Sequence, residues 1–284
     1  MNILVTGATG GYGSYAIEYV RKFAPEANVY GLVRNEEIGK SLIEKGFQIR
    51  IGDYSDYDSM VKALEGIDRL LFVSVAVPGV QKNVVDAAKA AGVKYIAYTS
   101  LHEPQYVKFG LEINHKQTES WIAESGIPHT FLRDSWYLEM PAPLVGTAIQ
   151  TGVFPYYAGE GKVTWAMKRE YAEAGARVIT REGYPKVLEL AGPPVSYREL
   201  GEAARTIAGR DMEIKAVSKE VFTRLMTGSG ISEMGLMLGT AYQDYALAGN
   251  NGEAESSPAI FEQVLGHPLM PLAEALKELL SLNP

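Results

Sequence analysis

The residues best suited to chemistry form a glycine-rich run that begins at Gly7 and directly follows an apolar segment. Glycines at a junction between a strand and a helix permit a tight turn and let backbone N–H groups approach a pyrophosphate. Gly7, Gly10 and Gly13 give the spacing GxxGxxG. The run therefore predicts a dinucleotide-binding loop, with a tight turn that holds no ligand as the alternative. The loop residues assigned to the cofactor are Gly7, Ala8, Thr9, Gly10, Gly11, Tyr12 and Gly13.

The run Val33-Arg34-Asn35, which ends the next apolar segment, predicts which dinucleotide binds. An acidic side chain at this place would hold the ribose hydroxyls of NAD and repel a 2′-phosphate. Arg34 can instead pair with the 2′-phosphate of NADP through charge-assisted hydrogen bonds. We therefore expect NADP(H) as the cofactor. The alternative is a solvated arginine beside Glu36 and Glu37.

Two further strand ends are expected to face the same crevice. Asp53 and Tyr54 follow the third apolar segment, where the Asp53 carboxylate could accept a hydrogen bond from the adenine amine or cap the next helix. Ser74, Val75 and Ala76 end the fourth segment, at the expected switch point of the sheet. Their small side chains leave room for the nicotinamide and its ribose. The alternative is a buried strand end without a ligand.

Several kinds of chemistry are excluded by what the chain lacks. It has no cysteine, which rules out disulfides, thiolate nucleophiles and thiolate zinc sites. The four histidines are too scattered to suggest zinc, so no metal site is expected. None of the 17 tyrosines has a lysine four positions later. The tyrosine–lysine acid of ordinary short-chain dehydrogenases is therefore missing, which argues against sugar epimerases and alcohol dehydrogenases.

The elements that must position these residues alternate in type along the first half of the chain, which is typical of a parallel sheet with crossover helices. We expect strands at 2–6, 29–33, 48–51, 69–75, 94–99 and 130–133, and helices at 12–23, 36–44, 57–64, 79–90 and 114–124. This order predicts a Rossmann-type doubly wound α/β fold, with an NADP(H)-binding domain over residues 1–150.

Residues 151–284 are expected to form a smaller, mainly helical lobe that closes the substrate cleft. Pro141, Pro143 and Gly152 predict loose structure where the lobe begins. Helices are expected at 169–180, 196–208, 219–226, 233–248, 258–265 and 271–282, and strands at 187–190 and 212–217, with one strand returning to the main sheet. The polar stretch 250–257 is predicted to be a mobile loop.

Charge and hydropathy limit the partners and the location. The formal net charge of -7 argues against a general nucleic-acid binder, which would need clustered Lys and Arg. No signal peptide and no apolar stretch of roughly 20 residues are found, so we expect a soluble cytoplasmic protein that does not enter a membrane. The sequence leaves open whether the protein is a monomer or a homodimer.

With the N-terminal loop, further motifs carry a resemblance to a known family. They are Leu32-Val33-Arg34-Asn35, Ala88-Lys89-Ala90-Ala91-Gly92-Val93-Lys94, Tyr98-Thr99-Ser100, Ser125-Gly126-Ile127-Pro128 and Gly266-His267-Pro268. The chain resembles the NmrA-like branch of the atypical short-chain dehydrogenases, and within it the group of NADPH-dependent quinone oxidoreductases and triphenylmethane reductases. The resemblance implies an NADPH-binding Rossmann domain and a substrate cleft under the small lobe. Its members include both reductases and redox sensors.

The resemblance also implies roles for single residues. Ser100 stands at the position of the active-site serine of the larger superfamily, while His115 lies near the usual lysine and Leu111 near the usual tyrosine. His115 could orient ribose hydroxyls, relay a proton or be an ordinary helix residue. Trp136 and Tyr137 would form an aromatic wall for the nicotinamide and a planar substrate, or else pack the lobe. The catalytic candidates are thus Tyr137, His115 and Ser100.

The expected function is hydride transfer from NADPH to quinones or similar electron-poor planar acceptors. A quinone suits a site without a strong acid, because the anion formed by hydride addition is stabilised and water can protonate it. The alternative is a redox sensor of the NmrA type, which binds NADP(H) and reports to a partner protein without turnover.

Overall fold

The computed structural model describes residues 1–282, which divide into two compact units. Unit 1 contains Met1–Asp134, Arg169–Leu190 and Ile260–His267, and unit 2 contains Ser135–Lys168, Ala191–Ala259 and the residues from Pro268 on. The chain therefore passes between the units several times, whereas a single boundary at residue 150 was expected. Segment 169–180, expected in the lobe, belongs to unit 1.

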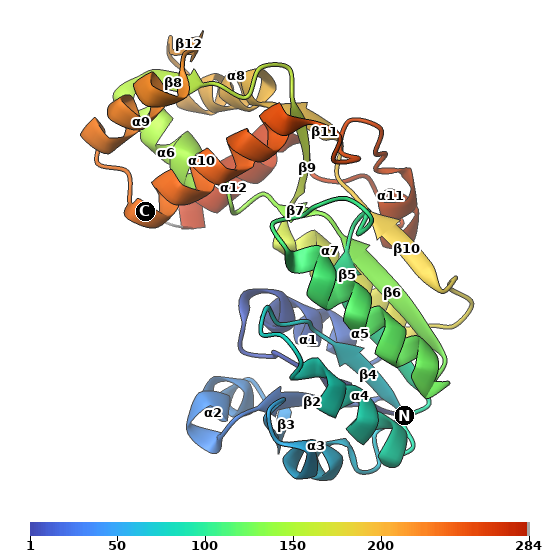
Figure 1. Cartoon of the computed structure of the whole chain (residues 1–284). Coiled ribbons are helices and arrows are strands. Elements are labelled where there is room, and N and C mark those ends of the chain that lie inside the picture. Colours follow the sequence, from blue (N-terminus) through green and yellow to red (C-terminus); the bar gives the residue numbers. More distant parts are fainter. Residues whose placement is uncertain (283–284) are drawn as a thin grey trace. The chain divides into compact units, whose positions relative to one another are not determined.

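Unit 1 has the expected Rossmann-type architecture (Figure 1). Its seven strands are all parallel, in the order β10-β6-β5-β4-β1-β2-β3. The strand expected to return to the main sheet is β10, which pairs with β6. Its elements are β1 (Asn2–Val5), α1 (Gly11–Phe23), β2 (Asn28–Val33), α2 (Glu36–Glu44), β3 (Gln48–Ile51), α3 (Tyr57–Leu64), β4 (Arg69–Phe72), α4 (Gln81–Ala90), β5 (Tyr95–Leu101), α5 (Leu111–Ser125), β6 (His129–Asp134), α7 (Lys168–Thr180), β10 (Val187–Leu190) and α11 (Ala259–Leu265).

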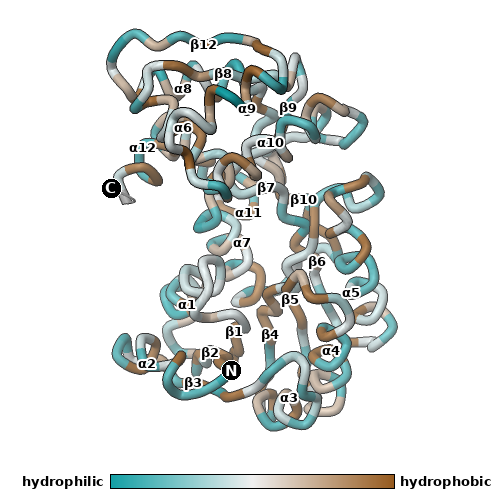
Figure 2. Tube along the Cα trace, turned by 60° about the vertical axis from the view of Figure 1, so that its left-hand side comes forward, coloured by the Kyte–Doolittle hydropathy of each residue, from teal (hydrophilic) through white to brown (hydrophobic). Residues whose placement is uncertain are grey.

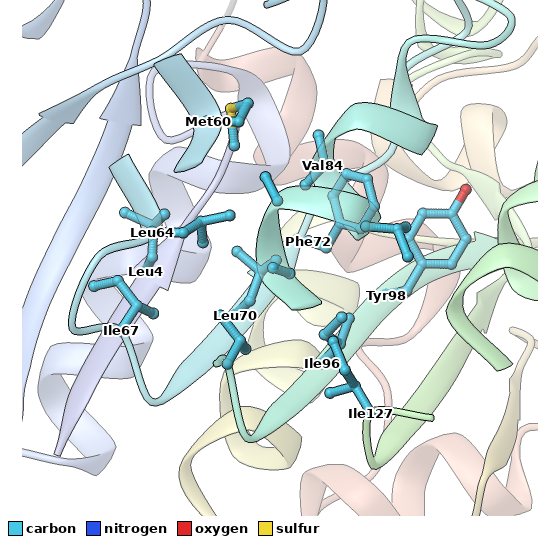
Figure 3. Packing of buried hydrophobic residues seen from close by; sticks show 14 of the residues in the cluster. Leu4, Met60, Leu64, Ile67, Leu70, Phe72, Val84, Ile96, Tyr98 and Ile127 are labelled. Atoms are coloured by element: carbon cyan, nitrogen blue, oxygen red, sulfur yellow. The ribbon is translucent and has the colours of Figure 1, made fainter. Parts of the chain in front are cut away.

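Helices cover both faces of this sheet. On one face, α3, α4 and α5 pack against β1, β4 and β5, and Figure 3 shows Met60, Val84 and Tyr98 in that core. On the other face, Gly31 leaves room for Ile17 of α1 and Leu42 of α2. Strands buried on both faces have nearly continuous apolar sequences, which is why brown concentrates on β4 and β5 in Figure 2. This packing fixes the carboxyl ends of the strands, where the candidate residues lie.

Unit 2 is smaller and mainly helical. A three-stranded sheet has the order β11-β9-β7, and β12 pairs with β8 in parallel. The helix α8 begins at a capping box in which Ser196 and Glu199 satisfy each other's backbone N–H groups. Its elements are β7 (Trp136–Tyr137), α6 (Ala142–Thr151), β8 (Val153–Tyr156), β9 (Lys162–Ala166), β11 (Pro194–Ser196), α8 (Tyr197–Ala208), β12 (Glu213–Ala216), α9 (Lys219–Gly228), α10 (Glu233–Ala248) and α12 (Leu272–Leu282).

Two expectations for unit 2 were wrong. The segment with Pro141 and Pro143 is not loose but forms α6, because proline in the first turn of a helix removes no hydrogen bond that the helix would make. The stretch 250–257 is not a free loop, since the fully buried Glu253 accepts hydrogen bonds from Trp136 Nε1 and the Tyr245 hydroxyl. Within residues 1–282, none of the helices combines the length and the apolar character that crossing a bilayer requires.

Candidate dinucleotide site

A pocket of about 470 Å³ lies within unit 1 and brings together seven of the fifteen predicted cofactor residues. Gly7, Thr9 and Gly10 line it together with Arg34, Asp53, Tyr54 and Val75, all of which follow strands β1 to β4. Ligands of open α/β sheets bind outside the carboxyl ends of the strands. The rest of the lining is Leu32, Val33, Ile38, Gly52, Ser55, Val77 and Val80.

The glycine loop has the geometry of an anion site. Gly7 takes the left-handed φ of +59°, and its carbonyl accepts the N–H of Gly10 at 2.8 Å. A Cβ on Gly13 would lie 2.1 Å from the Gly7 oxygen, so only glycine lets α1 begin this close to the turn. No side chain caps the start of α1, and its first turn contains no acidic residue. The positive end of the α1 dipole is therefore not neutralised by a side chain and favours a phosphate.

Arg34 and Asp53 stand on the wall made by β2 and β3. Arg34 is exposed just after β2, and within residues 1–282 no hydrogen bond or ion pair is found for its guanidinium. The Asp53 carboxylate accepts hydrogen bonds from the backbone N–H and the hydroxyl of Ser55, which lower its pKa. Asp56, not Asp53, caps α3. The capping alternative for Asp53 is therefore wrong, whereas its role at adenine stays a prediction.

The end of β4 is held by side chains from three other segments. The Ser74 N–H donates to Thr99 Oγ1 at 2.8 Å, and Asn114 Nδ2 donates to the Val75 oxygen at 2.9 Å. The Tyr54 hydroxyl lies 2.8 Å from the Val73 oxygen, and burial raises its pKa, so the phenol stays protonated. The backbone at the end of β4 is therefore held in place on the side of the pocket that a ligand would contact.

The catalytic candidates Ser100 and His115 make hydrogen-bond contacts with other side chains of unit 1. The Ser100 hydroxyl donates to Glu119 Oε1 at 2.6 Å, and the Arg133 guanidinium donates hydrogen bonds to both oxygens of that carboxylate. His115 Nδ1 lies 3.2 Å from the Tyr98 hydroxyl. Burial lowers the pKa of His115 to about 4, so its ring is neutral at pH 7. This favours a hydrogen-bonding role over a relay that titrates near neutrality, and the catalytic roles stay predictions.

Comparison with known proteins places the chain in a family. The model of the NmrA-like family matches residues 1–260. The chain belongs to the NmrA-like family. Quinone oxidoreductase 2 of Escherichia coli strain K12 is 34% identical over 99% of this chain and 99% of its own. An NAD(P)H azoreductase of Xenophilus azovorans is 28% identical over 81% of this chain and 82% of its own.

Solved structures agree with the fold of this NmrA-like protein. The triphenylmethane reductase of Citrobacter sp., complexed with NADP(H), superposes with a TM-score of 0.87 at 31% identity, covering 98% of this chain and 99% of that one. The E. coli quinone oxidoreductase complexed with NADPH gives a TM-score of 0.84 at 34% identity, with coverage of 98% and 99%. Both relatives were solved with the nucleotide predicted from Arg34.

The remaining predicted residues of the NmrA-like chain make contacts of other kinds. Trp136 belongs to unit 2, where it is buried edge-on against Tyr242 and Tyr245. Tyr137 follows it in β7, with Lys168 Nζ 5.1 Å from its ring centre. Tyr12 is buried, and its hydroxyl donates to the Tyr171 oxygen, so the loop can offer the nucleotide only its backbone there. The aromatic wall stays a prediction.

Sequence reasoning missed the apolar half of the pocket. Ile38 stands on the first turn of α2, just after Arg34, and no period links the two because Arg34 lies before the extended cap residue Asn35. Val77 and Val80 lie on the connection from β4 to α4, a segment without a periodic pattern. One group of possible metal ligands, His102, Glu103 and Glu189, was also not foreseen. Its Glu189 carboxylate is already bonded to His102 and Arg133.

Proposed function

We propose that this NmrA-like protein is an NADPH-dependent reductase that passes hydride to quinones or similar electron-poor planar acceptors. The observation that carries the proposal is the pocket that joins the uncapped start of α1 to Arg34. Such a pocket offers backbone amides to a pyrophosphate and one free cation to a 2′-phosphate. Similarity along the full chain to quinone and triphenylmethane reductases supports the choice of acceptor.

The residues present fit a nicotinamide nucleotide. Gly7 and Gly10 would let the pyrophosphate approach the backbone, and Arg34 would hold the 2′-phosphate. The fixed end of β4, with Val75 in the pocket wall, would lie beside the nicotinamide half. When bound, NADPH supplies a hydride to the acceptor and leaves as NADP⁺.

The proton balance fits the absence of a tyrosine–lysine acid. A quinone that gains one hydride and one proton becomes a hydroquinone, and water can provide the proton because the intermediate anion is stabilised. The Ser100 hydroxyl donates to Glu119 and His115 is neutral, so neither is set up as a strong acid, and a quinone does not need one. The protein contributes positioning of the nucleotide and the acceptor. The cytoplasmic location and the choice between monomer and homodimer stay predictions from the sequence.

The test is NADPH oxidation with a panel of quinones and planar dyes, beside nucleotide binding by calorimetry. We expect tight NADPH binding and turnover that requires the acceptor. Binding without turnover of any acceptor would favour the NmrA-type sensor. Absence of NADPH binding would contradict both functions.

A further inference from the structure

A second pocket of unit 1, of about 560 Å³, lies where the strands of the parallel sheet begin. Arg69 and Tyr95 are the first residues of β4 and β5, while Met1 and Pro128 directly precede β1 and β6. The dinucleotide pocket lies at the opposite ends of these strands and shares no lining residue with this one. We call the second pocket the amino-edge pocket. The rest of its lining is Asp68, Lys94, Arg181, Glu182, Gly183 and Tyr184.

Hydrogen bonds hold the walls of the amino-edge pocket in place. The Arg69 guanidinium donates to the Ile179 and Arg181 oxygens at 3.1 and 2.6 Å, which ties the end of α7 to the start of β4. The Thr130 hydroxyl donates to the Pro185 oxygen at 2.8 Å and fastens the other end of the connection from α7 to β10. A pocket whose walls are already fixed loses little conformational entropy when it binds a ligand.

The charges of the amino-edge pocket do not balance. Its lining contains three positive side chains, those of Arg69, Lys94 and Arg181, and two carboxylates. Asp68 is paired with Lys94 Nζ at 2.6 Å, and Glu182 is paired with Arg69 at 2.9 Å. Arg181 is exposed, and for its guanidinium no hydrogen bond or ion pair is found within residues 1–282. On a chain with a net charge of -7, this local excess of positive charge favours an anion.

Two tyrosines give the amino-edge pocket flat apolar faces. The Tyr95 hydroxyl donates to Thr130 Oγ1 at 2.6 Å, and the Arg69 guanidinium lies 5.1 Å from the centre of the Tyr95 ring. Burial raises the pKa of Tyr95, so the phenol stays neutral and adds no negative charge to the wall. Tyr184 lines the same pocket from the connection between α7 and β10. Aromatic faces beside a cation suit a ligand that combines a flat ring with a negative charge.

We propose that the amino-edge pocket binds an aromatic carboxylate, with its ring against Tyr95 and Tyr184 and its charge paired with Arg181. The volume of the pocket lies within the range of small-molecule sites, about 300–1,000 Å³. A guanidinium matches a carboxylate because its N–H groups can donate to both oxygens. A neutral molecule of the same shape would leave the arginine unpaired, and a carboxylate without a ring would leave the tyrosines uncovered. This binding site is independent of the proposed reductase function.

The first test compares three ligands on the parent protein. Calorimetry measures the binding of 2-naphthoate, of its uncharged amide and of acetate, each with and without saturating NADP⁺. We expect 2-naphthoate to bind at a saturable site whether or not NADP⁺ is present, and the two other ligands to bind at least about tenfold more weakly. Absence of saturable 2-naphthoate binding, binding that NADP⁺ abolishes, or equal affinity for the amide would each overturn the proposal.

The second test places the ligand in the pocket by substitution. Arg181→Gln removes an exposed charge and should raise the Kd for 2-naphthoate about tenfold, while the Kd for NADPH stays unchanged. Tyr184→Leu keeps an apolar side chain without the ring and should raise the Kd for 2-naphthoate about threefold. Arg224→Gln makes the same change at an exposed position of α9 and is the control.

The outcomes separate this pocket from the reductase function. An unchanged Kd for 2-naphthoate in Arg181→Gln, or an equal loss in Arg224→Gln, would overturn the amino-edge site. A protein that turns over no quinone but binds 2-naphthoate through Arg181 would contradict the reductase function and leave this site standing. Thermal unfolding shows whether each variant is folded, and the comparison of 2-naphthoate with its amide tests the need for charge without any substitution.

Discussion

Arg34 carries the choice of cofactor at the scale of a single residue. Arg34→Glu should weaken NADPH binding at least about tenfold, close to 1.4 kcal/mol, and remove the preference over NADH, because a carboxylate repels the 2′-phosphate. Calorimetry with both nucleotides measures this. Lys40→Glu makes the same charge reversal on α2 outside the pocket and is the control. Equal affinities for NADPH and NADH in the parent would contradict the assignment.

His115 offers a second test at this scale. Its pKa is lowered to about 4, mainly by burial, so the ring stays neutral over the range in which a free histidine titrates. The pH profile of kcat for His115→Gln should therefore run parallel to that of the parent between about pH 6 and pH 8. A proton relay predicts instead that the variant loses an inflection near neutrality. A raised KM for NADPH with an unchanged profile would indicate contact with the ribose.

The sequence could predict residues whose role depends on neighbours in the chain. The glycine loop and Arg34 follow their strands directly, so a pattern of a few residues placed them at one pocket. The partner of Ser100 could not be predicted in this way. Glu119 is 19 residues away and reaches Ser100 only because α5 packs back on β5. Ser100 therefore kept the role that the resemblance implied until its hydrogen bond was known.

At the scale of an element, the turn between β1 and α1 determines the geometry of the anion site. Gly13→Ala should destabilise the protein by about 1–3 kcal/mol, because the new methyl would meet the Gly7 carbonyl at 2.1 Å. Gly10→Val should be milder and leave the protein folded, because Gly10 has an ordinary φ of -86° and the tight contact of its Cβ with the Gly7 oxygen, at 3.2 Å, needs only a small shift.

The Gly10→Val variant should nevertheless lose most of its affinity for NADPH, because the valine side chain would occupy the space through which the pyrophosphate approaches the backbone. Denaturant unfolding and calorimetry on both variants separate the two effects. A folded Gly10→Val protein with full affinity would place the pyrophosphate elsewhere.

Element types were predictable wherever a period could be counted. The helices of unit 1 have buried faces at helical spacing, and its central strands are continuous apolar runs. The strands β7 and β11 contain two and three residues, too few to show a period. The helix α6 was missed because its first-turn prolines were interpreted as helix breakers.

At the scale of the whole molecule, the division into units depends on contacts between distant segments. The chain leaves unit 1 at Asp134, returns to it at Arg169 and enters it again at Ile260. The sequence around these three residues does not show the change of unit. The helix α7, for example, is amphipathic and could equally belong to the lobe. The sequence therefore suggested a single boundary at residue 150, and it could not show that the chain crosses between the units several times.

Asp134, the last residue of the first segment of unit 1, has a buried carboxyl for which no hydrogen-bond partner is found among residues 1–282. Burial raises its pKa well above the ordinary value. Between the unfolded pKa of about 4 and this higher value, the folded protein keeps a proton that the unfolded chain has lost. The free energy of unfolding therefore falls as the pH rises through this window, by up to about 1.4 kcal/mol per pH unit.

Asp134→Asn removes this titration while keeping the shape of the side chain. Its free energy of unfolding should therefore exceed that of the parent by a margin that grows as the pH rises from about 4 towards neutrality. Denaturant unfolding at several pH values measures the margin. Asp58→Asn, which removes an exposed carboxylate from the first turn of α3, is the control and should show no such growth. If the difference in the free energy of unfolding between Asp134→Asn and the parent stays constant with pH, Asp134 is ionised in the folded protein. A cation or solvent would then have to lie beside its carboxylate.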